Sequence, residues 1–224
     1  DDVDGDITNA IEISSNVDMQ VEGTYEVIYS VADSWGNTAS ETRVVNVNGN
    51  PVYLAENGVT VKAHDWAESG DVGIINGIEY YIVGSKEELI SFGQGWDNDE
   101  IGNLCTTKIT DMSSLFTNSS NFGVISGNIS VPNLKSWDVS NVTNMSGMFA
   151  NGVNGAIYFN HELEYWDVSN VTDMSYMFYG QNNTNVGNIE NWDVSNVTDM
   201  SYMFEVADSF NQDIGNWNVE NVTE

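Results

Sequence analysis

The amino-acid sequence predicts a mainly β chain: a solenoid of short strands and short helical turns, preceded by an α+β cap and a partial β-sandwich. Three observations support this fold class. One phrase repeats through the C-terminal half, stretches of alternating apolar residues precede it, and a two-residue turn signal separates two of those stretches. These features divide the chain into residues 1–49, 50–102 and 103–224.

In the first of these segments, residues 23–31 alternate between apolar and polar as a strand does. Residues 33–37 carry turn chemistry, and residues 43–47 read as a closing strand. This order of motifs resembles the later strands of the small immunoglobulin-like modules that are strung along bacterial surface proteins. The resemblance implies a β-sandwich that is incomplete in residues 1–49.

The second segment, residues 50–102, predicts a cap for the repeats. Asn76 and Gly77 lie between two apolar stretches, which is a strong signal for a two-residue β-hairpin. Ser85 and Glu88 have the spacing of a capping box and predict the start of a short helix. Because the first open edge of a solenoid must be covered, we expect this segment to cover it.

The third segment contains the strongest signal, an internal repeat. The phrase Trp-Asp-Val-Ser-Asn-Val-Thr-Asp-Met-Ser-Tyr-Met-Phe occurs at 166–178 and 192–204, and with two changes at 137–149. A degenerate copy lies at 109–116, and a further copy begins at Trp217. The tryptophans recur after 29, 26 and 25 residues. A period of this length is typical of a solenoid with one supersecondary unit per turn.

Each unit has two predicted parts. Trp-Asp-Val alternates as a short strand does, so stacked copies would form a parallel ladder. In the segment that follows, Val171, Met174 and Met177 are three residues apart, which predicts a short helical or 3₁₀ turn. The segment between Phe and the next Trp varies in length, and such insertions map to one face of a solenoid.

These units resemble the repeats of BspA-like bacterial surface proteins, which are related to leucine-rich-repeat proteins. The phrase Phe-Asn-Gln-Asp-Ile-Gly-Asn-Trp-Asn-Val at 210–219 carries the resemblance most closely, and residues 104–112 resemble the usual start of such an array. The resemblance covers about residues 103–224. It implies a curved solenoid on the cell surface that serves adhesion or protein binding, and it implies no catalytic residues.

The charge balance excludes some partners. The chain has 34 acidic and five basic residues, a formal net charge of −29. Binding to nucleic acid or to anionic membranes needs clusters of Lys and Arg, so we expect neither. No apolar run reaches the length of a membrane span, and we expect no direct membrane insertion. The many aromatic residues argue against disorder. We expect an extracellular location on the bacterial cell surface.

Two groups of carboxylates are candidate calcium ligands. Asp2, Asp4 and Asp6 place hard oxygen ligands close together, although the full twelve-residue calcium loop is absent. The second group recurs at the outward position of the predicted strands and comprises Asp138, Asp167 and Asp193. Stacked strands would place these like charges ~5 Å apart, so a cation or a hydrogen bond should relieve them. The alternatives are solvated turn carboxylates for the first group and hydrogen bonds to backbone for the second.

The aromatic residues fall into two groups. The repeat tryptophans share the direction of the neighbouring valines, so we expect them in the core rather than in a sugar-stacking row. Tyr176, Tyr179 and Tyr202 are predicted to be exposed and are candidates for binding a partner. Cys105 is the only cysteine, and we expect it to be a small buried apolar residue.

The sequence predicts no enzyme. His64 and His161 are isolated, so a zinc site is not expected, and no nucleophile elbow, P-loop or Rossmann fingerprint occurs. The first functional hypothesis is adhesion or protein–protein interaction, with a protein or glycan partner on a host or neighbouring cell. The alternatives are a carbohydrate-binding module and a structural stalk or surface-layer element stiffened by calcium. Because the last repeat is incomplete, we also expect fraying or self-association at the C-terminal repeat edge.

Overall fold

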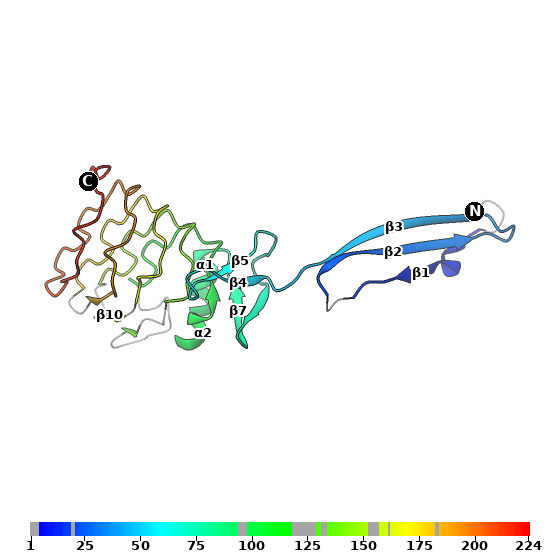
Figure 1. The fold of residues 1–224 in the computed structure, drawn as a ribbon, viewed down its shortest axis with the longest axis horizontal. Coiled ribbons are helices and arrows are strands. Elements are labelled where there is room, and N and C mark those ends of the chain that lie inside the picture. Colours follow the sequence, from blue (N-terminus) through cyan, green and yellow to red (C-terminus); the bar gives the residue numbers. More distant parts are fainter. Residues whose placement is uncertain are drawn as a thin grey trace. The chain divides into compact units, whose positions relative to one another are not determined.

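The structure is a computed structural model that is mainly β, with several small sheets (Figure 1). It describes residues 5–18, 21–93, 98–117, 129–130, 134–151, 157–160, 162–181 and 184–224. The chain forms two compact units, residues 1–50 and residues 51–224. Each unit is treated by itself.

The described part of the first unit contains one antiparallel sheet, with the strand order β1-β2-β3. A 3₁₀ turn at Thr8–Ala10 precedes β1 (Glu12–Ser15), and the long strands are β2 (Gly23–Ala32) and β3 (Thr38–Val47). Asp33 holds the turn between β2 and β3, because its Oδ1 accepts hydrogen bonds from the backbone N–H groups of Trp35 (2.9 Å) and Asn37 (2.8 Å). The predicted strands at 23–31 and 43–47 are thus present, joined by the predicted turn.

The second unit begins with two small sheets. Strand β4 (Val52–Leu54) pairs with β5 (Val61–Ala63), and β6 (Val72–Ile75) pairs with β7 (Ile78–Ile82). The turn between β6 and β7 has Asn76 at φ 52° and Gly77 at φ 81°, as a two-residue hairpin turn requires. The predicted hairpin is confirmed. Strand β8 (Leu104–Cys105) adds to β7 in parallel.

Two helices lie between β7 and β8: α1 (Lys86–Gly93) and α2 (Asn98–Gly102). The predicted helix start is confirmed, because the Ser85 hydroxyl accepts a hydrogen bond from the Glu88 backbone N–H (3.1 Å). The second half of the capping box differs from the prediction. The Glu88 carboxylate accepts hydrogen bonds from the Gly84 backbone N–H (2.8 Å) and the Ser69 hydroxyl (2.6 Å).

The position of the parallel pairing within the repeats corrects the sequence prediction. No Trp-Asp-Val segment is a strand in the described repeats. Instead, the parallel bridges join the Asp or Asn before each Met-Ser pair, in the order Asp111, Asn144, Asp173, Asp199. The physical reason lies in the backbone turns on either side of this segment. The Trp166 N–H donates to Leu163 O (3.1 Å) and the Val171 N–H donates to Val168 O (2.9 Å), so the backbone between them is too short to form a strand.

The predicted helical turn is also only approximate. Single turns form, as in the hydrogen bonds from Met177 N–H to Met174 O (3.2 Å) and from Tyr179 N–H to Tyr176 O (3.0 Å). The turns do not continue as a 3₁₀ helix, because Tyr176 has a left-handed backbone with φ 56°. The longer insertions carry short parallel strands in the order β11-β10-β9. Their bounds are Ile129–Ser130 (β9), Ile157–Asn160 (β10) and Thr184–Asn185 (β11).

Hydrogen bonds join each repeat to the preceding one, and in every repeat they come from the equivalent Trp, Asn and Thr side chains. The Trp166 indole N–H donates to Leu134 O (3.0 Å), the Asn170 amide to Ser140 O (2.7 Å), and the Thr172 hydroxyl to Thr143 O (3.1 Å). The equivalent bonds recur at every junction from residues 101–110 to the last repeat. Figure 1 shows the result as successive turns, coloured green to red, that lie side by side.

The core of this unit runs through the repeats. Phe116, Phe149, Phe178 and Phe204 form a column of stacked rings with centroids 5.4, 5.7 and 5.8 Å apart. Buried methionines and valines of the same phrase surround this column. Trp137, Trp166 and Trp192 are buried, so the prediction that the repeat tryptophans pack in the core is confirmed for them.

Candidate functional site

The surface that stands out in the repeats is a tyrosine patch, which we define as Tyr176, Tyr179 and Tyr202. Tyr176 and Tyr202 occupy the same position in successive repeats, and 42% and 55% of their surfaces are exposed. Their rings stack with centroids 4.8 Å apart, and the half-buried Tyr179 ring lies 5.7 Å from that of Tyr176. The structure therefore brings together all three tyrosines predicted to bind a partner.

The backbone under this patch is left-handed. Tyr176 and Tyr202 both have φ 56°, and the equivalent positions in the two preceding repeats are Gly147 (φ 59°) and Ser114 (φ 53°). This conformation costs an L-residue roughly 1–2 kcal/mol, and glycine adopts it freely. Gly147 is the sequence signal that could have revealed this feature. The repeat can thus be built with glycine here, yet two units carry a large aromatic residue.

Acidic residues lie next to the tyrosine patch. Partial burial raises the pKa of the Tyr176 phenol, and the neighbouring Tyr202, Glu205, Tyr179 and Asp199 raise it further. The hydroxyl therefore stays protonated and can donate a hydrogen bond at neutral pH. Rings bordered by carboxylates favour cationic groups, because a Lys or Arg can contact both the ring face and the acid.

The predicted row of carboxylates at Asp138, Asp167 and Asp193 is not a uniform outward row. Asp167 and Asp193 are exposed and Asp138 is only 1% exposed. Each Oδ1 accepts a hydrogen bond from the backbone N–H two residues on, at 3.0–3.1 Å. Hydrogen bonds from the Ser195 hydroxyl and amide hold the pKa of Asp193 below its usual value.

Asp138 is the unusual member of this row. Its Oδ1 lies 3.5 Å from the Lys62 ammonium and accepts a hydrogen bond from the Ser140 hydroxyl (2.7 Å). Its Oδ2 is buried without a hydrogen-bond partner. Lys62 belongs to β5 and also donates to the Ser140 hydroxyl (3.0 Å), so this pair joins the first sheets of the unit to the first full repeat.

An in-register column lies elsewhere, at the bridge positions Asp111, Asn144, Asp173 and Asp199, three of which are acidic. Lys86 of α1 neutralises its first member, with its ammonium 3.0 Å from Asp111 Oδ2. The pKa of Asp111 is lowered: burial raises it, but hydrogen bonds from Ser113 and the Lys86 charge outweigh that effect. The repeat pattern did not reveal this column, because its alternation predicts the parallel pairing at Trp-Asp-Val.

The remaining candidate residues are the N-terminal aspartates, Cys105 and His161. Asp6 accepts hydrogen bonds from the Thr8 hydroxyl and N–H, which lower its pKa, while Asp2 and Asp4 lie outside the described residues. Cys105 is buried as predicted, and burial raises the pKa of its thiol. His161 also lies outside the described residues. In the described parts of the chain, no group of three or more His, Cys, Asp or Glu side chains is arranged to hold a metal ion.

Calcium binding is testable by melting the protein in sodium chloride and in calcium chloride at equal ionic strength. With a net charge of −29, we expect the Tm to rise with either salt, because screening weakens the self-repulsion of the folded state. Each stabilisation of ~1 kcal/mol raises the Tm by about 2–4 °C in a domain of this size. A further rise specific to calcium, reversed by a chelator, is the result that the predicted calcium sites require.

Comparison with known families agrees with this architecture. Residues 1–47 match the family described as bacterial surface protein, Ig-like domain. Two overlapping matches, to residues 89–182 and 124–224, are to the family described as Mycoplasma protein of unknown function, DUF285. No curated protein and no solved structure matches the chain. In the described residues, no helix has the length and apolar character to cross a membrane.

The two family matches indicate a bacterial surface protein. The matches at 89–182 and 124–224 together span more than half of the sequence. The chain therefore belongs to the family described as Mycoplasma protein of unknown function, DUF285.

Proposed function

We propose that the chain is an interaction module of a bacterial surface protein, which mediates adhesion by binding a partner protein through the tyrosine patch. The repeats are proposed to form a BspA-like solenoid, related to leucine-rich repeats, that presents this patch on one face. The parallel bridges and the recurring hydrogen bonds between neighbouring repeats support this arrangement. Stacked repeats can present equivalent groups at regular spacing, so weak contacts add through multivalency.

The observation that carries the proposal is the pair Tyr176 and Tyr202. Both rings are exposed and stacked on each other, and both residues hold a left-handed backbone that glycine provides one repeat earlier. Residues with strain of this kind cluster at binding and catalytic sites. Tyrosine is also enriched at the centres of protein interfaces, where it combines a large apolar ring with a polar end.

The charge of the chain indicates the chemistry of the partner. Glu205 and Asp199 lie near Tyr176, and the whole chain carries a charge of −29. A partner surface with Lys or Arg side chains would contact the ring faces and be attracted by the acidic field. We therefore propose a basic partner protein on a host or neighbouring cell. The association should weaken as salt is added.

The test replaces both tyrosines by glycine, the residue that stands at this position in the repeat at 137–149. In the double variant Tyr176→Gly/Tyr202→Gly, we expect stability to change by less than about 1 kcal/mol, because relief of the left-handed strain offsets the added freedom of the unfolded chain. Adhesion of beads coated with this variant to cultured epithelial cells or to neighbouring bacterial cells should fall at least about tenfold, as loss of two interface hot spots predicts.

The matched control is Ser114→Gly, which makes the same change at the same repeat position without removing a ring. It should adhere like the unaltered protein. Equal adhesion of all three proteins would contradict the proposal. If removal of glycans from the target cells abolishes adhesion, the carbohydrate-binding alternative is favoured instead, since a stacked aromatic pair also fits a sugar ring.

A further inference from the structure

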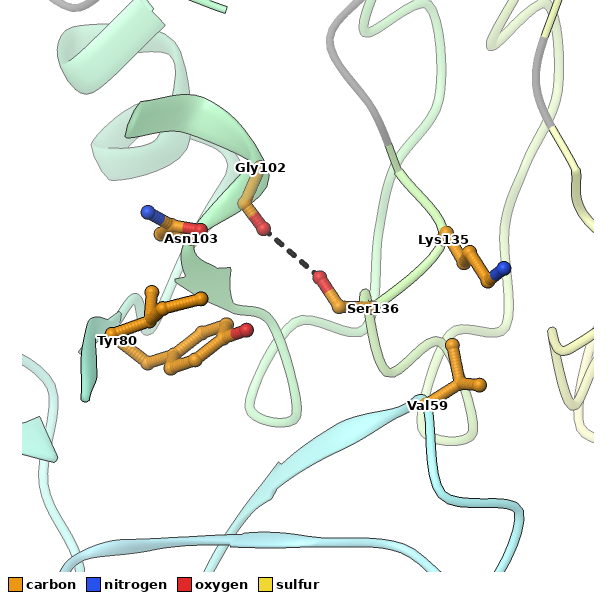
Figure 2. A pocket seen from close by; sticks show the side chains of 7 residues that line it. Val59, Tyr80, Gly102, Asn103, Lys135 and Ser136 are labelled. Carbon is orange, nitrogen blue, oxygen red and sulfur yellow. Dashed lines mark hydrogen bonds between the residues drawn. The ribbon is translucent and has the colours of Figure 1, made fainter. Parts of the chain in front are cut away.

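A second site lies away from the tyrosine patch, in a pocket of about 400 Å³. Its lining comes from the start of the 51–224 unit and the segment that leads into the first full repeat: Val59, Ile78, Tyr80, Gly102, Asn103, Lys135 and Ser136. Figure 2 shows these side chains around the pocket. A cavity of this size, with apolar walls and a few polar groups, is typical of a small-ligand site.

Some polar side chains of this pocket remain able to bond to a ligand. Tyr80 is only 8% exposed, and its hydroxyl has no hydrogen-bond partner in the described residues. Figure 2 shows this hydroxyl directed toward the side of the pocket where Ser136 lies. Burial raises the pKa of the Tyr80 phenol, so it remains a donor at neutral pH. The hydroxyl is therefore available to donate a hydrogen bond to a ligand in the pocket.

Two further polar side chains face the same space. Asn103 uses its backbone N–H and carbonyl in bonds to Glu100 and Tyr81, and its side-chain amide remains available as both donor and acceptor. The Ser136 hydroxyl donates its proton to Gly102 O (2.9 Å), so its remaining lone pairs can accept. Tyr80, Asn103 and Ser136 therefore offer a mixture of donors and acceptors, which is what the hydroxyl groups of a ligand require.

The charges around the pocket favour a neutral ligand. Lys135 contributes its aliphatic stem, because its ammonium is held 3.0 Å from the Glu162 carboxylate and lies 5.0 Å from the centre of the Tyr165 ring. Figure 2 shows that ammonium pointing away from Tyr80. None of the described residues that line the pocket carries a carboxylate, and the net charge of −29 repels anions.

We propose that this pocket binds one neutral sugar ring, with its C–H face against Tyr80, Val59 and Ile78 and its hydroxyls bonded to Tyr80, Asn103 and Ser136. An apolar and aromatic wall beside uncharged donors and acceptors matches the two faces of a pyranose. This site is independent of the tyrosine patch, so the failure of either proposal leaves the other standing.

The experiment titrates the full 224-residue chain with methyl glycosides of glucose, galactose, mannose and N-acetylglucosamine, and with N-acetylneuraminic acid as an anionic comparator. NMR would follow the backbone amide signals. We expect at least one neutral glycoside to shift the signals of Tyr80, Asn103 and Ser136. Tyr80→Phe keeps the ring and removes only the hydroxyl, so it should fold normally and weaken this binding about tenfold, the effect of one buried hydrogen bond.

The matched control is Tyr53→Phe, which removes the same atom from a tyrosine in β4 that does not line the pocket. It should bind like the unaltered chain, and thermal melting of both variants confirms folding. The proposal is overturned if no neutral glycoside shifts these signals, if only N-acetylneuraminic acid does, or if Tyr80→Phe binds with unchanged affinity.

Discussion

Phe149→Ala is expected to lower the free energy of unfolding of the 51–224 unit by about 3–5 kcal/mol, the usual cost of removing a buried phenylalanine. Phe149 is fully buried, and its ring is stacked between Phe116 at 5.4 Å and Phe178 at 5.7 Å, with Trp166 at 6.1 Å. The substitution therefore removes contacts on both sides of the column and leaves a cavity between two repeats. Urea denaturation followed by tryptophan fluorescence measures the loss.

The control for this prediction is Phe204→Ala, at the last ring of the same column. Phe204 is half-buried, stacks on Phe178 at 5.8 Å and lies against the tilted ring of Phe210, with centroids 4.1 Å apart. Because part of its surface already faces solvent, we expect a loss about half as large. Equal losses in the two variants, or a loss below about 1 kcal/mol for Phe149→Ala, would show that the column does not carry the stability of the repeats.

The second large effect is expected for Lys62→Met, which removes the positive partner of the buried Asp138 carboxylate. A buried charge without its partner destabilises a protein by about 3–5 kcal/mol. Lys62 is 28% exposed, so solvent screens part of this pair and we expect about 2–3 kcal/mol here. The Ser140 hydroxyl, which bonds to both Lys62 and Asp138, also loses one of its partners.

Lys135→Met provides the matched control, because it breaks the ion pair with Glu162 whose members are 36% and 58% exposed. Pairs of this kind contribute at most about 1 kcal/mol. Chemical denaturation of both variants separates the two cases. A Lys62→Met variant as stable as Lys135→Met would mean that the pair of Lys62 and Asp138 does not stabilise the folded protein.

The sequence was most informative where local chemistry decides the structure. Asn76 and Gly77 adopt the positive φ angles that their hairpin needs, and the Ser85 hydroxyl begins helix α1 as its spacing predicts. The burial of the repeat tryptophans followed from their place in the phrase. In each of these cases the deciding interaction lies within a few residues, so a single sequence contains it.

Prediction failed where turns interrupt an alternating pattern or where distant residues meet. Trp-Asp-Val has the alternation of a strand, but backbone turns close on both sides of it, from Trp166 N–H to Leu163 O (3.1 Å) and from Val171 N–H to Val168 O (2.9 Å). The parallel bridge forms instead at Asp173 and its equivalents. The pair of Lys62 and Asp138 and the pocket at Tyr80 join residues far apart in sequence, and no repeat pattern reveals them.

The bonds between neighbouring repeats have a mechanical consequence. Each repeat holds the one before it through the same indole, amide and hydroxyl groups, and the phrase that supplies them hardly varies. When only nearest neighbours are linked, a tensile load applied to the last repeat reaches the rest of the array one junction at a time. Such an array is expected to peel repeat by repeat at a nearly constant force. A surface protein built in this way would dissipate shear gradually rather than rupture in one step.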